Sequence, residues 1–110
     1  MKTLKKVKDH LKKKVSEDKY KECIALLKSV KKLSKDKEHD QELLELAALL
    51  YNVGIDNAFE YLIEIDVPLS KAEKICNCIT KEAVTVEAEI LHKAALLQNM
   101  EIIEDEKIPN

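Results

Sequence analysis

The chain has 110 residues, which is enough for one domain with a modest hydrophobic core. A single glycine, two prolines and abundant Leu, Ala, Glu and Lys favour helices over strands. Aromatic residues make up only 4% and Trp is absent, which counts against a base-stacking surface for single-stranded nucleic acid. The formal net charge of −2 also excludes a uniformly basic surface.

The two parts of the chain carry opposite charge. Residues 1–38 contain 14 Lys and 6 acids, whereas residues 39–110 contain 5 Lys and 15 acids. Such asymmetry indicates an anionic partner for the basic part or self-association between opposite ends. The sequence contains no Arg, which is the side chain best suited to recognising phosphate and guanine. The alternative is a solvated lysine surface that reflects only a compositional bias.

Cysteine usage and hydropathy bear on localisation. Cys23, Cys76 and Cys78 form an odd set without the spacing of a disulfide framework, which favours a reducing cytoplasm. The basic stretch MKTLKKVKDHLKKKV is not followed by the apolar segment of a secretory signal. No apolar run approaches the length needed to span a bilayer. We therefore expect a cytoplasmic protein that has no membrane partner.

The first two predicted helices carry most of the lysines. An apolar stripe at helical spacing predicts a basic amphipathic helix over residues 1–15; its positions are Leu4, Val7, Leu11 and Val15. Ser16, followed by two acids, is a typical N-cap for a second helix that ends in a polar loop after residue 33. The stripe is too narrow for the first helix to be buried on all sides. Its lysines form a candidate polyanion face, made of Lys2, Lys5, Lys6, Lys8, Lys12, Lys13 and Lys14.

The third predicted helix, near residues 41–53, is the central one. Asp40 is expected to cap its amino end. Residues 43–50 are apolar nearly all round the helix, which is typical of an element buried in the middle of a fold. Gly54 is expected to supply a left-handed C-cap.

Three more helices complete the chain. Asp56 opens a fourth helix that ends before Pro68, and the segment SKAE at 70–73 predicts a capping box for a fifth. Thr85 begins a sixth helix, and residues 98–110 are expected to form an acidic, loosely ordered tail. No repeat or linker divides the chain. Residues 1–110 therefore predict a single compact all-α domain of about six helices.

The stretch LELAALLYNVG, residues 44–54, resembles the central helix of the HD-domain family of metal-dependent phosphohydrolases. That helix ends in His-Asp, followed by an apolar residue and Gly. The resemblance implies an HD-domain-like helical fold over roughly residues 18–97. In the family, a His on an earlier helix, the His-Asp pair and a later Asp hold a divalent cation that polarises a phosphoryl oxygen or activates water. Here Tyr51 and Asn52 stand in the His-Asp positions.

The other ligand positions are also altered. The resemblance places Glu22, or Cys23 with a one-residue shift, at the earlier His, and the triplet Lys93-Ala94-Ala95 at the later Asp-Ala-Asp. Tyr would ligate only as a phenolate, Asn offers a weak neutral carbonyl, and Lys would repel a cation. The resemblance thus implies a vestigial pocket, with no metal or other cofactor. Its residues are Glu22, Tyr51, Asn52 and Lys93.

Other apparent motifs have simpler interpretations. His39-Asp40 precedes the central helix, where an N-cap explains Asp40. Glu89 and His92 have the three-residue spacing of metal pairs in helical bundles, but no second such pair exists, so we expect a surface hydrogen bond. Cys76 is expected in the core, because a C-x-C pair on a helix points its thiols in different directions.

Three functions remain open from the sequence. The first is a catalytically inactive HD-like domain with a binding, regulatory or scaffolding role toward a protein partner or a second copy. The second is weak binding of nucleic acid or another polyanion by the lysine-rich helices. The third is a residual phosphohydrolase with a rearranged metal site.

Overall fold

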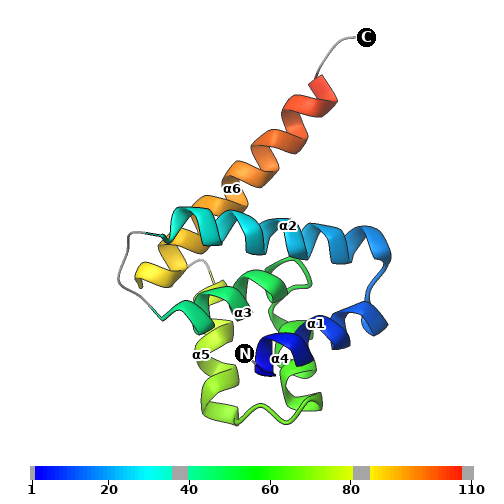
Figure 1. Cartoon of the computed structure of the whole chain (residues 1–110), viewed down its shortest axis with the longest axis vertical. Helices are drawn as coiled ribbons and strands as arrows, with labels where there is room; N and C mark the ends of the chain where they lie inside the picture. Colours follow the sequence, from blue (N-terminus) through cyan, green and yellow to red (C-terminus); the bar gives the residue numbers. More distant parts are fainter. Residues whose placement is uncertain (1, 36–39, 81–84, 108–110) are drawn as a thin grey trace.

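Six α-helices make up the regular structure in the computed structural model, which describes residues 2–35, 40–80 and 85–107 (Figure 1). In chain order they are α1 (Lys2–Lys14), α2 (Glu17–Leu33), α3 (Gln41–Tyr51), α4 (Ile55–Glu64), α5 (Leu69–Ile79) and α6 (Val86–Lys107). No strand occurs among these residues. The prediction of a single compact all-α domain of about six helices is confirmed.

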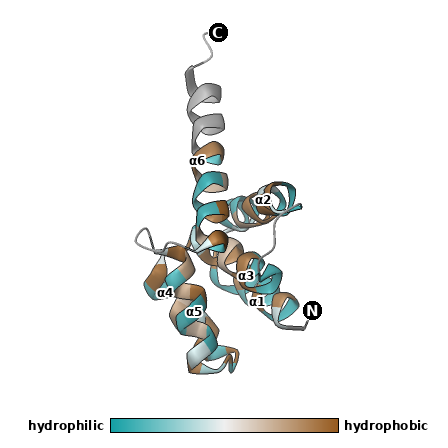
Figure 2. Ribbon diagram, turned by 90° about the vertical axis from the view of Figure 1, so that its left-hand side faces the viewer, coloured by the Kyte–Doolittle hydropathy of each residue, from teal (hydrophilic) through white to brown (hydrophobic). Residues whose placement is uncertain are grey.

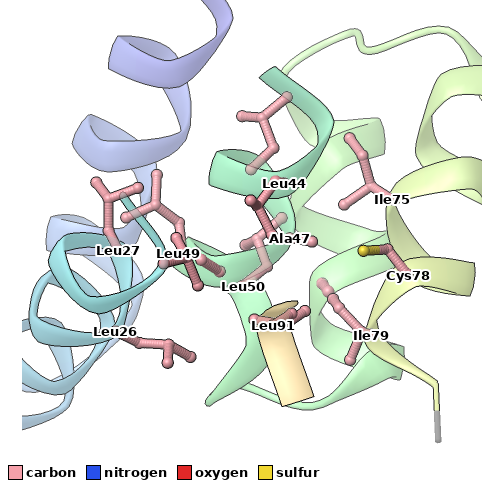
Figure 3. Packing of buried hydrophobic residues seen from close by; sticks show 14 of the residues in the cluster. Leu26, Leu27, Leu44, Ala47, Leu49, Leu50, Ile75, Cys78, Ile79 and Leu91 are labelled. Carbon is pink, nitrogen blue, oxygen red and sulfur yellow. The ribbon is translucent and has the colours of Figure 1, made fainter. Parts of the chain in front are cut away.

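Helix α3 lies at the centre and contacts each of the other five helices. Residues 44–50 are all buried, and Leu46, Leu49 and Leu50 are 0% exposed. Figure 3 shows Leu44, Leu49 and Leu50 packed between the side chains of α2 and α5. A helix that is apolar nearly all round must be covered on every side, and the prediction of a central buried helix is confirmed.

Three helices begin at the caps that the sequence predicts. The Ser16 hydroxyl accepts a hydrogen bond from the Lys19 amide at 3.2 Å, and the Asp40 carboxylate accepts one from the Leu43 amide at 3.1 Å. Thr85 Oγ1 accepts from the Ala88 amide at 3.1 Å, ahead of α6. Each cap satisfies an amide that has no partner within its own helix.

The role of Gly54 differs from the prediction. Asn52 is the C-cap of α3, and Gly54 is instead the N-cap of α4, where its carbonyl accepts from the Ala58 amide at 2.9 Å. Its φ of 89° is positive, as expected, but its ψ of 155° is far from the left-handed helical value. The prediction of positive φ at Gly54 is therefore right, but the residue caps the start of α4 and not the end of α3. Helix α4 begins at Ile55 rather than at Asp56.

The capping box predicted at 70–73 is wrong. Helix α5 begins at Leu69, one residue before the predicted cap, and Pro68 is its N-cap. The Pro68 carbonyl accepts from the Ala72 amide at 2.9 Å, and no side chain caps this helix. Proline fixes its own φ and still offers a carbonyl, so Ser70 falls within the first turn.

The first and last helices are covered least. Helix α1 buries Leu4, Val7 and Leu11 and turns most of its lysines outward, and Figure 2 shows hydrophilic residues along it. Helix α6 packs against α2, α3 and α5 and then runs beyond the body as far as Lys107 (Figure 1). Residues 98–107 of the predicted tail thus continue the helix instead of being loosely ordered, because no Gly or Pro interrupts them, and residues 108–110 lie outside the described part of the chain.

None of the helices described here combines the length and the hydropathy that crossing a bilayer requires.

Candidate functional site

The carboxyl end of α3 brings Tyr51 beside His92 of α6. The two rings lie 6.2 Å apart between centroids, at an interplanar angle of 55°. His92 Nε2 lies 3.1 Å from the carbonyl oxygen of Ile79, so the imidazole links α6 to the end of α5. The predicted Glu89–His92 hydrogen bond does not form; His92 is half-buried and contacts the core. No sequence pattern predicts this contact, since Tyr51 and His92 are far apart in the chain.

Asn52 follows Tyr51 as the C-cap of α3. Its side-chain Nδ2 atom is buried and has no hydrogen-bond partner among the described residues. A buried amide without a partner costs folding free energy, of the order of 1–3 kcal/mol. An apolar side chain at position 52 would therefore cost less folding free energy than this asparagine does.

Glu22 and Lys93, the other two residues of the vestigial pocket, lie on exposed parts of α2 and α6. Glu22 forms an ion pair with Lys19 at 3.2 Å, and its backbone carbonyl accepts from Gln98 Nε2 at 3.2 Å. Lys93 lines a hollow of about 250 Å³ together with Leu33, Glu89 and Ile90. No hydrogen bond or ion pair joins any two of Glu22, Tyr51, Asn52 and Lys93 in the described part of the chain.

The three thiols are buried and poorly ionised. Burial raises the pKa of Cys23 to about 11 and that of Cys78 to about 12, and it raises the pKa of Cys76 as well. Because the thiolate is the form that attacks or ligates, these groups are unreactive near neutral pH. The core position expected for Cys76 is confirmed, and Cys78 is buried too, which the sequence did not indicate.

No three His, Cys, Asp or Glu side chains are placed to hold one metal ion within residues 2–35, 40–80 and 85–107. The most buried carboxylate, Glu45, is held by protein contacts. It accepts from Gln41 Nε2 at 2.6 Å and lies 3.9 Å from Lys31 Nζ. Glu45 therefore connects α3 to Lys31 of α2.

Two shallow hollows lie along α5. One, of about 280 Å³, is lined by Leu43, Lys74, Asn77, Cys78 and Thr85. The other, of about 310 Å³, shares Leu43 and Lys74 and adds Asp40, Glu42, Ser70 and Lys71. Lys71 forms an ion pair with Glu42 across the second hollow. Burial raises the pKa of Cys78, the thiol in the first hollow, and Lys71 in the second hollow is held by Glu42.

Most lysines of the candidate polyanion face on α1 point to solvent. Five of its seven members are exposed, Lys8 is half-buried, and the side chain of Lys2 lies outside the described residues; the exposed ones are Lys5, Lys6, Lys12, Lys13 and Lys14. Lys14 Nζ lies 3.5 Å from Glu64, and Lys12 lies 5.5 Å from the ring centroid of Tyr20. The remaining exposed members make no ion pair with a described residue.

The two flanks of α1 differ. On one flank, His10 Nε2 lies 2.8 Å from Glu64 Oε1 and its ring packs edge-on against Tyr61 of α4 at 5.5 Å. This hydrogen bond and the nearby Lys14 lower the pKa of Glu64. On the other flank, a hollow of about 440 Å³ opens where α1 meets α2. Its lining residues are Lys12, Val15, Ser16, Glu17, Tyr20 and Lys21.

Comparison with known proteins adds no family to these observations: no protein-family model, curated protein or solved structure matches the chain.

Proposed function

We propose that this chain is a non-catalytic, HD-like helical domain of the cytoplasm that acts by binding a protein, in a regulatory or scaffolding role. The observation that carries the proposal is the chemistry at the carboxyl end of α3. Tyr51 and Asn52 occupy the positions of the His-Asp pair in the HD-domain resemblance, and neither is a competent ligand at neutral pH.

The surroundings of these residues support the same proposal. Tyr51 packs against the His92 ring, and His92 Nε2 is already engaged by the Ile79 carbonyl. Lys93, at the position of the later Asp, is cationic and exposed. One carboxylate, that of Glu22, and one amide compete poorly for Mg²⁺, Mn²⁺ or Zn²⁺.

Elemental analysis and a thermal melt test this proposal. We expect no stoichiometric metal in the purified protein, no hydrolysis of phosphate mono- and diesters, and the same melting temperature with Mn²⁺ as with chelator. A metal at 100 times its dissociation constant would add about 2.7 kcal/mol of stability, which a melt detects. About one metal per chain, with metal-dependent hydrolysis, would overturn the proposal in favour of a residual phosphohydrolase. Glu22, Glu89 and His92 would then be the first residues to substitute.

A second candidate function is polyanion binding by the lysine face of α1. It is favoured by the exposed Lys5, Lys6 and Lys13, which make no ion pair with a described residue. Without Arg or a run of stacking aromatics, we expect weak binding to DNA or RNA that shows no sequence preference and falls steeply with salt.

Fluorescence polarisation at physiological salt tests this second function. The test variant replaces Lys5, Lys6, Lys12 and Lys13 with Gln, and a control replaces the exposed Lys74 and Lys93. Submicromolar binding that only the first variant loses would place polyanion binding ahead of protein binding.

A further inference from the structure

The structure separates the two charged ends of the chain. Helix α6 contacts α2, α3 and α5 but not α1, and Figure 1 shows its far end on the side of the body away from α1. Residues 101–107, EIIEDEK, carry four carboxylates and one lysine. Because this segment continues a straight helix, it does not reach the lysine face of its own α1.

The end of α6 leaves the body after Gln98. The hydrogen bond from Gln98 Nε2 to the Glu22 carbonyl ties the helix to α2, and the helix then continues to Lys107. Just before this point, Leu96 is 60% exposed and Leu97 is 42% exposed. Isolated helical turns are marginal in water, and most helical stability comes from packing an apolar face. The projecting part of α6, residues 99–107, therefore favours a surface that covers it.

The far flank of α1 offers matching chemistry. Lys5, Lys8 and Lys12 recur at three- and four-residue spacing, which places them along one side of the helix. This row leads to the hollow between α1 and α2, where Lys12 lies beside the apolar Val15 and the ring of Tyr20. The same hollow also holds one acid, Glu17, which lies 3.8 Å from Lys21 Nζ. The segment EIIEDEK combines four acids with two adjacent isoleucines, so its composition complements both the lysines and the apolar wall of the hollow.

We propose that residues 99–107 of one copy bind across the lysine face of α1 and the adjoining hollow of a second copy. This inference rests on the proposed binding role and names a second copy of this chain as the partner. The occupant is a second copy because the complementary charge lies on the same chain but cannot be reached within it. The contact is therefore head to tail, and salt weakens it.

Charge reversal in full-length protein tests the contact. One variant, Glu101→Lys/Glu104→Lys, alters the projecting helix, and another, Lys5→Glu/Lys12→Glu, alters the face. A matched control, Lys74→Glu/Lys93→Glu, reverses two exposed lysines elsewhere. Sedimentation over a concentration series, at low and high salt, measures the association. Circular dichroism of each variant checks that it is folded.

We expect the wild type to self-associate at low salt and each altered variant alone to weaken this by about tenfold or more, corresponding to roughly 1.4 kcal/mol. An equimolar mixture of the two variants should associate again, because each supplies the charge that the other now needs. The control should associate like the wild type. A wild type that stays monomeric at every concentration overturns the inference, as does a mixture that fails to restore association. Neither result concerns metal binding or hydrolysis, so the non-catalytic proposal would be unaffected.

Discussion

Helices α3 and α1 are of similar length, 11 and 13 residues, but they serve opposite purposes. Helix α3 buries seven consecutive residues, 44–50, and contacts every other helix. Helix α1 buries only the stripe formed by Leu4, Val7 and Leu11, and presents its lysines to solvent. The packing of the domain is therefore centred on α3, whereas α1 can carry a charged surface without disturbing that packing.

The largest expected effect is in α3. Leu49→Ala removes a fully buried side chain between α2 and α5 and leaves a cavity, so we expect a loss of about 2–5 kcal/mol. Urea denaturation followed by circular dichroism measures this. The matched control is Leu97→Ala on the exposed side of α6, which should change stability by no more than about 0.5 kcal/mol. If Leu49→Ala and Leu97→Ala lower the free energy of unfolding equally, α3 does not lie at the centre of the core.

The turn that ends α3 is the next most sensitive point. Gly54→Ala places a Cβ on a backbone with φ of 89°, although nothing lies within 4 Å of that atom. The cost is therefore backbone strain alone, and we expect about 1–3 kcal/mol. Chemical denaturation measures it beside Glu60→Ala, an exposed helical position that should be nearly neutral. A neutral Gly54→Ala would mean that the turn adopts another conformation.

The contrast between α3 and α1 could be predicted from the sequence because it depends on patterns several residues long. Seven apolar or small positions within residues 43–50 leave no polar face, whereas the narrow apolar stripe of α1 leaves a wide one. Single-residue signals were less reliable. Gly54 and Ser70 have the right chemistry for caps, but the adjacent chain decides which helix end a residue occupies.

The candidate site was harder to predict than the fold. The sequence assigns Glu22 and Lys93 to the site only by matching leucine- and alanine-rich patterns to the helices of the HD-domain family. The structure places both residues on exposed helix surfaces. The contact of Tyr51 with His92 depends on how α6 crosses α3, which no local pattern specifies. The projection of α6 was missed because acidic residues near a chain end suggested disorder, although they are good helix formers.

A pair of cap substitutions tests how α3 and α5 begin. Asp40→Ala removes the carboxylate that accepts from the Leu43 amide, so we expect a loss of about 1 kcal/mol. Ser70→Ala should be nearly neutral, because Pro68 precedes α5 and no side chain caps it. The two variants are compared by urea denaturation at the same pH. A larger loss for Ser70→Ala would restore the capping box that the structure contradicts.

The smallest effect is expected where α1 meets α4. The Glu64 carboxylate is exposed, and its hydrogen bond from His10, followed by the charge of Lys14, lowers its pKa. A carboxyl whose pKa is lower in the folded state adds stability above its unfolded pKa of about 4.3. That stability is lost as the pH falls through the lower, folded value.

Glu64→Gln should therefore melt below the wild type near neutral pH, and the two melting temperatures should converge as the pH falls below about 4. The control is Glu60→Gln, an exposed position on the same helix that should follow the wild type throughout. Thermal melts of the wild type and both variants across this pH range measure the melting temperatures. A difference in melting temperature that stays constant at every pH would mean that Glu64 acts through packing. Helix α1 would then be held in place, like α3, by packing and not by charge.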